Sequence, residues 1–235
     1  MGITRRVREI LESQFVDYVG FADIADYSDE VIRYGGNIVK GYRRAVSIGI
    51  IIPDSIVDHL PERSDPNVAA EYRVHGYEVL NQRLNHVASL LSSHLNRQGY
   101  PTLPIAAADR TDEERATPTV SHKMIAHIAG IGWIGKNCLL VTAEHGPRLR
   151  LVSLLTDAPI EAAVRLRTSV CNGCDACVKA CPVGAIKGRP FQLGEDREER
   201  FDFRKCEDYL RTLRAASNGV CGMCLHACPY GTSQK

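Results

Sequence analysis

CNGCDACVKACP, residues 171–182, contains four cysteines in the spacing Cys-x2-Cys-x2-Cys-x3-Cys, followed by a proline at the last position. This spacing is typical of bacterial iron-sulfur sites, in which three closely spaced thiolates surround one cluster and the fourth binds a neighbouring cluster. A second run, residues 221–229, has the spacing Cys-x2-Cys-x3-Cys-Pro, and Cys206 lies fifteen positions before it. The eight cysteines therefore predict two 4Fe-4S clusters in a bacterial ferredoxin-like module.

The crossover of the fourth ligand divides these cysteines into two interleaved sets. We predict that Cys171, Cys174, Cys177 and Cys228 bind one cluster, and that Cys181, Cys206, Cys221 and Cys224 bind the other. Structural zinc is the main alternative, although a four-cysteine zinc site does not require two Cys-x3-Cys-Pro endings. Disulfides are a weaker alternative, because they persist in oxidising compartments and we see no signal in the sequence that would export the chain to one.

Composition describes an ordinary globular protein: 235 residues, 44% hydrophobic, with 29 basic and 28 acidic residues giving a net charge of +1. This balance provides no general attraction to nucleic acid. The longest apolar runs are too short to cross a membrane, and Met1–Tyr18 is too charged for a signal peptide, so we expect a cytoplasmic protein without membrane segments. Only Cys138 precedes residue 170. We therefore expect two domains, residues 1–160 and 161–235.

The N-terminal part mixes helix and strand patterns. Apolar residues at helical spacing predict a surface helix over Thr4–Tyr18 and a longer one from Tyr77 to Leu95. β-branched Ala45–Ile52 reads as a buried strand, and further strands are expected at Leu103–Ala108, Leu139–Thr142 and Leu149–Leu155. Because strands and helices do not alternate regularly, we predict an α+β fold with a mixed sheet. The basic pairs Arg43–Arg44 and Arg148/Arg150 read as solvated surface.

GIGWIGK, residues 130–136, satisfies the pattern G-x-G-x-x-G. A dinucleotide-binding loop follows a strand and precedes a helix. Here the order is reversed, because Ser121–Ala129 reads as a helix and Leu139–Val141 as a strand. Two interpretations stay open: a loop whose glycines let a cofactor approach closely, and a tight structural turn packed by Trp133.

In combination, these motifs identify a family. AGIGWIGKNCLLV (residues 129–141), the four-cysteine run, RKCEDYL (204–210) and CGMCLHACPY (221–230) resemble the epoxyqueuosine reductases and their relatives, the reductive dehalogenases. The resemblance implies a nitroreductase-like α+β domain, a double 4Fe-4S module and a cobalamin bound between them. It also implies that an external ferredoxin- or flavodoxin-type donor supplies the electrons.

The resemblance also implies which residues contact the cobalamin. Carried over by position, they are Gly130, Gly132, Trp133, Gly135, Lys136, Asn137, Leu140, Leu151, Asp208 and Gly222. The motif D-x-H-x-x-G, which supplies a lower axial histidine in other cobalamin proteins, does not occur in the sequence. We therefore expect a base-off cobalamin without a protein ligand to cobalt.

One departure from the family concerns the proton donor. The family's Asp-Thr-x-Pro segment supplies this acid seventeen residues before the loop tryptophan, where this sequence has Ala116. A Glu/Asp-Arg pair of the family is replaced by His122 and Lys123, which we name as candidate catalytic residues. Tyr72 and Tyr77 are further candidates, by analogy with the dehalogenases. An ordinary packed or surface role is the alternative for each.

Two functions are consistent with these features. The first is a cobalamin-dependent reductase acting on a small molecule or a modified base, and because the acid is missing we expect that tRNA is not its substrate. The second is a ferredoxin-like electron-transfer protein that docks a partner, such as a corrinoid protein, without substrate chemistry of its own. Ala116 favours the second function, whereas the combined loop and cysteine pattern favours the first.

Overall fold

A computed structural model describes residues 2–108, 110–112, 114, 117–162, 166–217 and 219–232. The chain divides into two compact units, each assembled from three segments. The first unit contains residues 1–50, 81–131 and 150–167, and the second contains 51–80, 132–149 and 168–235. The compact units interleave along the chain. The expected division into two domains near residue 160 stays a prediction.

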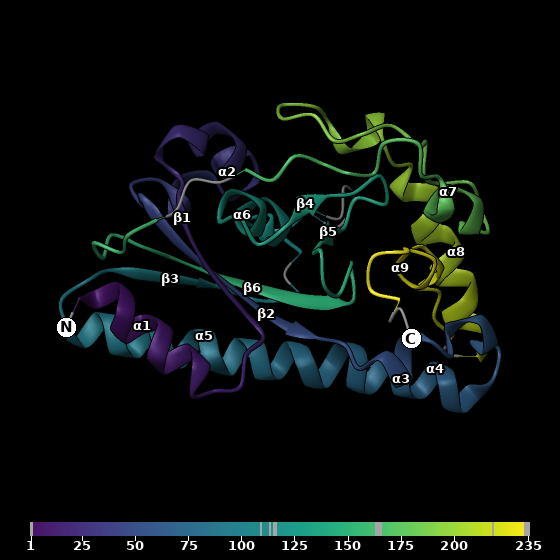
Figure 1. Cartoon of the computed structure of the whole chain (residues 1–235), viewed down its shortest axis with the longest axis horizontal. Helices are drawn as coiled ribbons and strands as arrows, with labels where there is room; N and C mark the ends of the chain where they lie inside the picture. The colour runs from purple at the N-terminus through teal and green to yellow at the C-terminus, as the bar shows by residue number, and fades with distance from the viewer. Residues whose placement is uncertain are drawn as a thin grey trace. The chain divides into compact units, whose positions relative to one another are not determined.

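A four-stranded sheet organises the first unit, in the order β1-β2-β6-β3 (Figure 1). Its strands are β1 (Tyr18–Asp23), β2 (Arg44–Ile51), β3 (Thr102–Ile105) and β6 (Leu149–Thr156). β1 pairs antiparallel with β2, and β3 pairs antiparallel with β6. The predicted mixture of helices and sheet is therefore confirmed.

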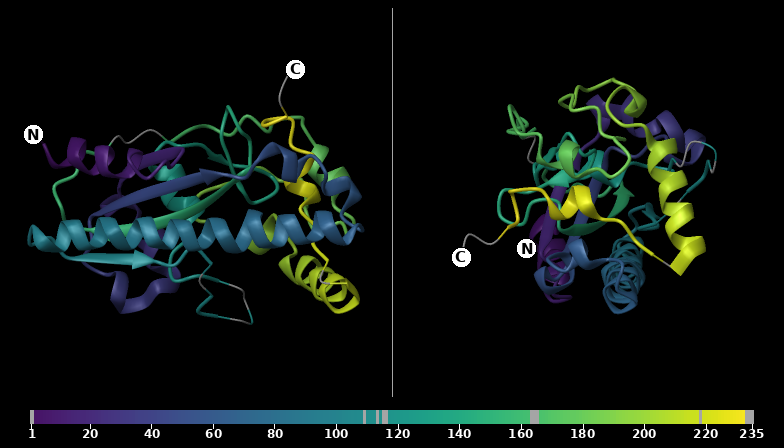
Figure 2. Two further views of the ribbon diagram at one scale, coloured as in Figure 1. Left: turned by 90° about the horizontal axis from the view of Figure 1, so that it is seen from below. Right: turned by 90° about the vertical axis from the view of Figure 1, so that its right-hand side faces the viewer.

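Helices cover both faces of this sheet (Figures 1 and 2). They are α1 (Ile3–Glu12), α2 (Ser28–Gly35), α5 (Leu80–Arg97) and α6 (His122–Ile128). The long α5 lies along one face and α6 lies on the other (Figure 1). Leu84, Leu91 and Leu95 of α5 are completely buried, as the three- and four-residue spacing predicts. Val152 and Leu154 of β6 are likewise completely buried.

The first helix is shorter than predicted. α1 ends at Glu12, and β1 begins at Tyr18, within the range expected to be helical. Phe15 takes a left-handed conformation, with φ of 55°, and its side chain is 83% exposed, although the periodicity placed it on the buried stripe. A bulky residue in this conformation ends a right-handed helix, so the chain turns into the sheet.

Short helices and irregular segments make up the second unit. Its α-helices are α3 (Asp54–Val57), α4 (Pro66–Arg73), α7 (Ala176–Ala180), α8 (Phe203–Ser217) and α9 (Met223–His226), and a π-helix spans Val74–Val79. β4 (Trp133–Ile134) and β5 (Leu140–Val141) form a two-stranded antiparallel sheet. The glycine loop from residue 132 onward and all eight predicted iron-sulfur ligands therefore lie in one unit.

Candidate iron-sulfur site

The nine cysteines all lie within the described ranges, and none forms a disulfide. Cys177 lies within α7, and Cys181 immediately follows that helix. Cys206 lies in the first turn of α8, and α9 contains Cys224. Helices α7, α8 and α9 of the second unit thus carry, or directly precede, four of the eight predicted ligands.

Four of these thiols form a first group. Burial, together with the charges of Cys171 and Cys174, raises the pKa of Cys177 to about 11. Burial likewise raises the pKa of Cys228 to about 12, with added contributions from Cys171, Cys177 and Cys174. These four residues are the set that the crossover pattern assigns to one cluster. We call them the first cysteine group.

The other four thiols form a second group. Burial, followed by the charges of Cys221 and Cys181, raises the pKa of Cys206 to about 11. The pKa of Cys224 is also raised, first by burial and then by Cys221 and Cys206, with smaller contributions from Cys177 and Cys181. We call Cys181, Cys206, Cys221 and Cys224 the second cysteine group. It has the composition predicted for the other cluster.

The chemistry of both groups fits iron-sulfur clusters. Thiols that are buried beside one another resist ionisation, whereas iron binds the thiolate and supplies the compensating positive charge. A 4Fe-4S cluster takes four cysteines, which is the size of each group. Within the described ranges, no three His, Cys, Asp or Glu side chains are grouped so that they could hold a single metal ion. Ligation by the two groups stays a prediction.

The glycine loop connects a helix to a strand, as predicted. Ser121 caps α6, and its side chain accepts a hydrogen bond from the backbone N–H of Met124 at 3.4 Å. Gly130 follows the helix in a left-handed conformation, with φ of 73°. Strands β4 and β5 lie on either side of the second half of the loop. The helix-first order confirms that this loop is not a dinucleotide fingerprint.

Two loop glycines are required by the loop itself. A Cβ on Gly132 would lie 2.2 Å from the carbonyl oxygen of Val141, and one on Gly135 would lie 2.7 Å from the side-chain oxygen of Asn137. Cys138 completes the turn with φ of 58°, and its N–H bonds to the Gly135 carbonyl at 2.9 Å. These contacts support the interpretation of residues 132–138 as a tight structural turn.

The side chains that follow Gly135 point into the cysteine segments. Lys136 is 6% exposed and donates to the carbonyl oxygen of Cys174 at 3.0 Å and to a carboxylate oxygen of Asp175 at 2.8 Å. Asn137 is 5% exposed and donates to the carbonyl oxygen of Cys224 at 3.1 Å. Lys136 lowers the pKa of Asp175 by hydrogen bonding and by charge. Consecutive loop residues thus contact both cysteine groups.

Trp133 packs beside the first cysteine group. Its ring forms a buried apolar cluster with Val141 and Cys228, and Cys171 and Tyr230 pack against this cluster. The ring of Tyr230 meets it edge to face, with centroids 5.0 Å apart. The indole Nε1 is buried and has no hydrogen-bond partner among the described residues. Since a buried N–H normally has an acceptor, this donor fits a polar ligand such as a cofactor.

The remaining residues implied by the resemblance lie in varied environments. Leu140 and Leu151 are buried, and Leu151 lies on β6 of the first unit. Asp208 is exposed on α8 and lies 3.9 Å from the guanidinium of Arg211. Gly222 precedes α9 with φ of 68°. Contact of these residues with a corrin ring stays a prediction.

The candidate catalytic pair lies at the start of α6. Both ring nitrogens of His122 are engaged: Nε2 donates to the carbonyl oxygen of Ala106 at 2.9 Å, and Nδ1 lies 2.9 Å from the hydroxyl of Ser153. Lys123 is half-buried. Ala116 lies outside the described residues. Tyr72 is buried and meets Tyr77 edge to face at 6.1 Å. Proton donation by any of them stays a prediction.

Cys138 is held from a different direction. Arg200 is 5% exposed and donates to the Cys138 sulfur at 3.4 Å. The same guanidinium lies 3.4 Å from Glu195 and 4.9 Å from the centroid of the Phe191 ring. This environment makes Cys138 a small, packed residue of the turn.

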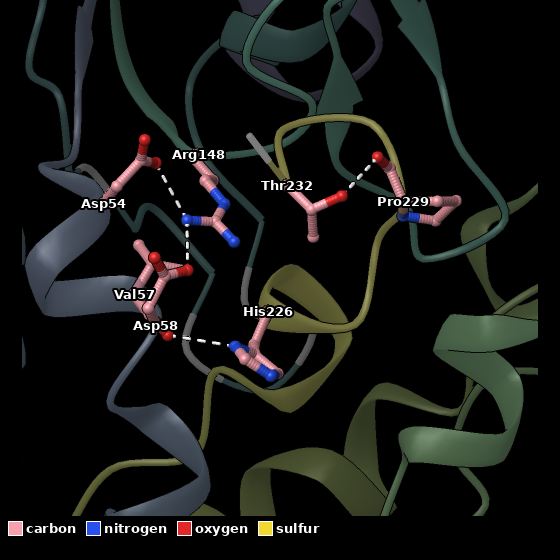
Figure 3. Close-up of polar contacts among 7 residues, drawn as sticks. All are labelled: Asp54, Val57, Asp58, Arg148, His226, Pro229 and Thr232. Carbon is pink, nitrogen blue, oxygen red and sulfur yellow. Dashed lines mark hydrogen bonds and ion pairs between the residues drawn. The ribbon is translucent and has the colours of Figure 1, made fainter. Parts of the chain in front are cut away.

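Arg148 corrects the expectation of a solvated basic surface. Its side chain is 1% exposed, and Nη1 donates to Asp54 at 2.8 Å and to Asp58 at 2.7 Å (Figure 3). The backbone carbonyl of Val57 lies 3.1 Å from Nδ1 of His226 (Figure 3). The α3 segment is therefore linked both to Arg148 and to α9. Sequence charge alone gave no sign of this, because the acidic partners lie about ninety residues earlier.

No helix in the described part of the chain is both long and apolar enough to cross a membrane.

The comparison with known protein families concerns the C-terminal part of the chain. Residues 170–232 match the family model of the 4Fe-4S dicluster domain. The prediction of two 4Fe-4S clusters is confirmed by this match, and the division of the cysteines between them stays a prediction. The C-terminal part of the chain is thus an iron-sulfur dicluster domain.

Among curated proteins, the chain is similar to epoxyqueuosine reductase of Synechococcus sp. (strain CC9605). The two are 33% identical over 159 residues, which is 66% of this chain and 46% of the relative. Alignments to the first curated relatives, all epoxyqueuosine reductases, cover 30% to 46% of their length. The chain thus matches less than half of each of these relatives, and the predicted resemblance is confirmed.

Solved structures share the fold over nearly the whole chain. A reductive dehalogenase, described as suggesting a mechanism for B12-dependent dehalogenation, gives a TM-score of 0.73 at 19% identity and covers 97% of this chain and 32% of that one. An epoxyqueuosine reductase with an epoxyqueuosine-modified tRNA-Tyr stem loop gives 0.61 at 18% identity, covering 98% and 66%. At these identities, the likeness establishes the fold.

Proposed function

We propose that this chain is an iron-sulfur reductase whose cysteine groups hold two 4Fe-4S clusters that deliver single electrons to a base-off cobalamin. The observation that carries the proposal is the match of residues 170–232 to the 4Fe-4S dicluster domain, within a fold shared by epoxyqueuosine reductases and reductive dehalogenases. A ferredoxin- or flavodoxin-type protein would supply the electrons from outside.

Cobalamin is part of this proposal because a structural relative is described as B12-dependent. When bound, it would supply a low-valent cobalt that reduces the substrate. Trp133 would donate its unpaired indole N–H to the cofactor. Lys136 and Asn137 would act differently from the roles that the resemblance implies, since their side chains bind the cysteine segments.

We also propose a nitroreductase-like arrangement for the first unit. Two antiparallel strand pairs in one sheet, with helices on both faces, support this arrangement. A cytoplasmic location belongs to the same proposal, because thiols destined for iron ligation persist in a reducing compartment.

The substrate class has two candidates, and one expectation must be corrected. A structural relative is an epoxyqueuosine reductase with a modified tRNA stem loop, so the expectation that tRNA is not the substrate is unsupported. A modified tRNA base therefore stands beside a small molecule as a substrate to test. With alanine at position 116, the proton must come from another group, and His122 and Lys123 remain our candidates.

A second function, electron transfer to a partner protein, is favoured by Ala116 alone. In that case the chain would use its clusters without reducing a substrate itself. Retained cobalamin without turnover, together with partner-dependent electron transfer, would decide for this alternative.

Anaerobic isolation followed by iron, sulfide and corrin analysis tests the proposal. We expect two clusters per chain and a spectral change on adding cob(II)alamin, with binding near one per chain. The reduced protein should then act on an epoxyqueuosine-modified stem loop or on a halogenated phenol, which represent the two substrate classes. A chain that contains clusters but gives no spectral change with cob(II)alamin would remove the reductase proposal.

A further inference from the structure

The turn after β4 brings two consecutive side chains to two different cysteine groups. The Lys136 ammonium contacts Cys174 of the first group, and the Asn137 amide contacts Cys224 of the second. Asn137 also accepts a hydrogen bond from the N–H of Leu139 at 3.2 Å, which fixes its orientation within the turn. One of the two contacts carries a charge and the other does not.

The charged contact is well protected from water. The Lys136 side chain is 7% exposed, whereas its carboxylate partner, Asp175, is 49% exposed. Water therefore screens the Asp175 charge more strongly than the Lys136 charge. Lys179 is a second cation that acts on Asp175. The first cysteine group thus has a buried cation hydrogen-bonded to one of its ligand segments.

The second cysteine group has a cation of its own. Arg63 donates from Nη1 to the sulfur of Met223 at 3.1 Å. Met223 lies between Cys221 and Cys224, at the first position of α9. Arg63 is half-buried and belongs to the 51–80 segment of the same unit. Each cysteine group therefore has a different cation beside one of its ligand segments.

We propose that the charges of Lys136 and Arg63 set the reduction potentials of the two clusters separately. Lys136 acts on the cluster of the first cysteine group, and Arg63 acts on the cluster of the second. The inference deepens the proposed function and rests on it only in requiring that both clusters are present.

The physical basis is the charge change on reduction. Each cluster takes up one electron from the reductant, and no bond forms or breaks. A nearby cation favours the more negative reduced state, so it raises the reduction potential. Replacing Lys136 by a neutral residue leaves the Asp175 carboxylate beside the first group and should lower that potential. Removing the Asp175 charge instead should raise it.

Redox titration with dithionite, followed by electron paramagnetic resonance, tests this on the whole reconstituted chain. We expect Lys136→Met to shift only the first cluster to a more negative potential, and Arg63→Met to shift only the second. Each variant is the matched control of the other. A Cys206→Ala chain, which should keep only the first cluster, assigns the two signals.

Opposite signs distinguish a charge effect from simple loosening of the loop. Asp175→Asn should shift the first cluster to a more positive potential. Lys136→Arg keeps the positive charge, so its first cluster should have a potential near that of the unmodified chain. Equal shifts of both clusters in Lys136→Met, or shifts of the same sign in Lys136→Met and Asp175→Asn, would overturn the proposal. If Lys136→Met fails to fold, Asp175→Asn and Lys136→Arg still decide. Failure to bind cobalamin would refute the proposed reductase while leaving these potentials measurable.

Discussion

Gly222 shows how one residue combines a backbone requirement with a packing requirement. Its φ of 68° places it in the left-handed region just before α9. An added Cβ would lie 2.7 Å from Cδ1 of Leu60 and 3.2 Å from the hydroxyl oxygen of Tyr72. Gly222 therefore has a structural reason to be glycine that is independent of the cofactor contact implied by the resemblance.

Gly222→Ala should destabilise the protein by about 1–3 kcal/mol, because the left-handed backbone and the close contact both oppose a side chain. Urea unfolding followed by circular dichroism measures this change. Gly173→Ala is the control, because no atom lies within 4 Å of its Cβ position. Equal stability of the two variants would contradict the packing argument.

Cys206→Ala should remove about half of the iron, because it breaks only the second cysteine group. Cys138→Ala should retain all of it, since Cys138 packs against Arg200 and belongs to neither group. Iron and sulfide analysis of the two anaerobically purified variants measures the difference. Loss of both clusters in Cys206→Ala, or zinc in place of iron, would argue against the assignment.

Trp133→Phe should weaken cob(II)alamin binding about fivefold, since a hydrogen bond contributes about 1 kcal/mol. The ring contacts with Tyr230 and Cys228 should survive, so the iron content should be unchanged. Spectroscopic titration gives the affinity. Unaltered binding would show that the indole N–H does not serve the cofactor.

At the scale of elements, local patterns predicted what local forces determine. Leu84, Leu91 and Leu95 identified α5, and the β-branched run identified β2, because both patterns are contiguous in sequence. The end of α1 was missed because a single left-handed residue, Phe15, redirects the chain. The burial of Arg148 was missed because its carboxylate partners come from a distant segment.

The candidate site divides in the same way. Spacing restricts which thiols can surround one cluster, so it allows a partition of the cysteines to be predicted, and that partition stays a prediction. The contacts of Lys136 and Asn137 could not, because their partners lie 38 and 87 residues further along the chain. Glycine spacing predicted a tight loop, but it gave no information on what the loop residues would touch.

The α3 helix should depend on two carboxylates that substitute for each other. Asp54→Asn or Asp58→Asn alone should cost less than about 1 kcal/mol, because the other carboxylate still pairs with Arg148. The double variant leaves a buried guanidinium unpaired and should cost about 3 kcal/mol, more than the sum of the two. Urea unfolding of all three variants measures this non-additivity. Asp208→Asn, in an exposed ion pair, serves as the control.

At the scale of the whole molecule, the two compact units should respond differently to iron removal. Clusters would connect residues 171–228 within the second unit, whereas the sheet and α5 of the first unit have their own buried core. Chelation should therefore accelerate amide hydrogen exchange in α7 and α9 and leave β2 and α5 unchanged. Hydrogen exchange with mass spectrometry locates the effect. Equal acceleration in both units would contradict it.

The interleaving of segments also has a consequence for biosynthesis. The second unit needs residues 51–80, 132–149 and 168–235, and its first cysteine group closes only with Cys228. A ribosome adds about 5–20 residues each second, so the early segments wait several seconds for their partners. With this assignment, the first cluster can be completed only after Cys228 has emerged, and until then Cys171, Cys174 and Cys177 would be exposed to oxidation on the nascent chain.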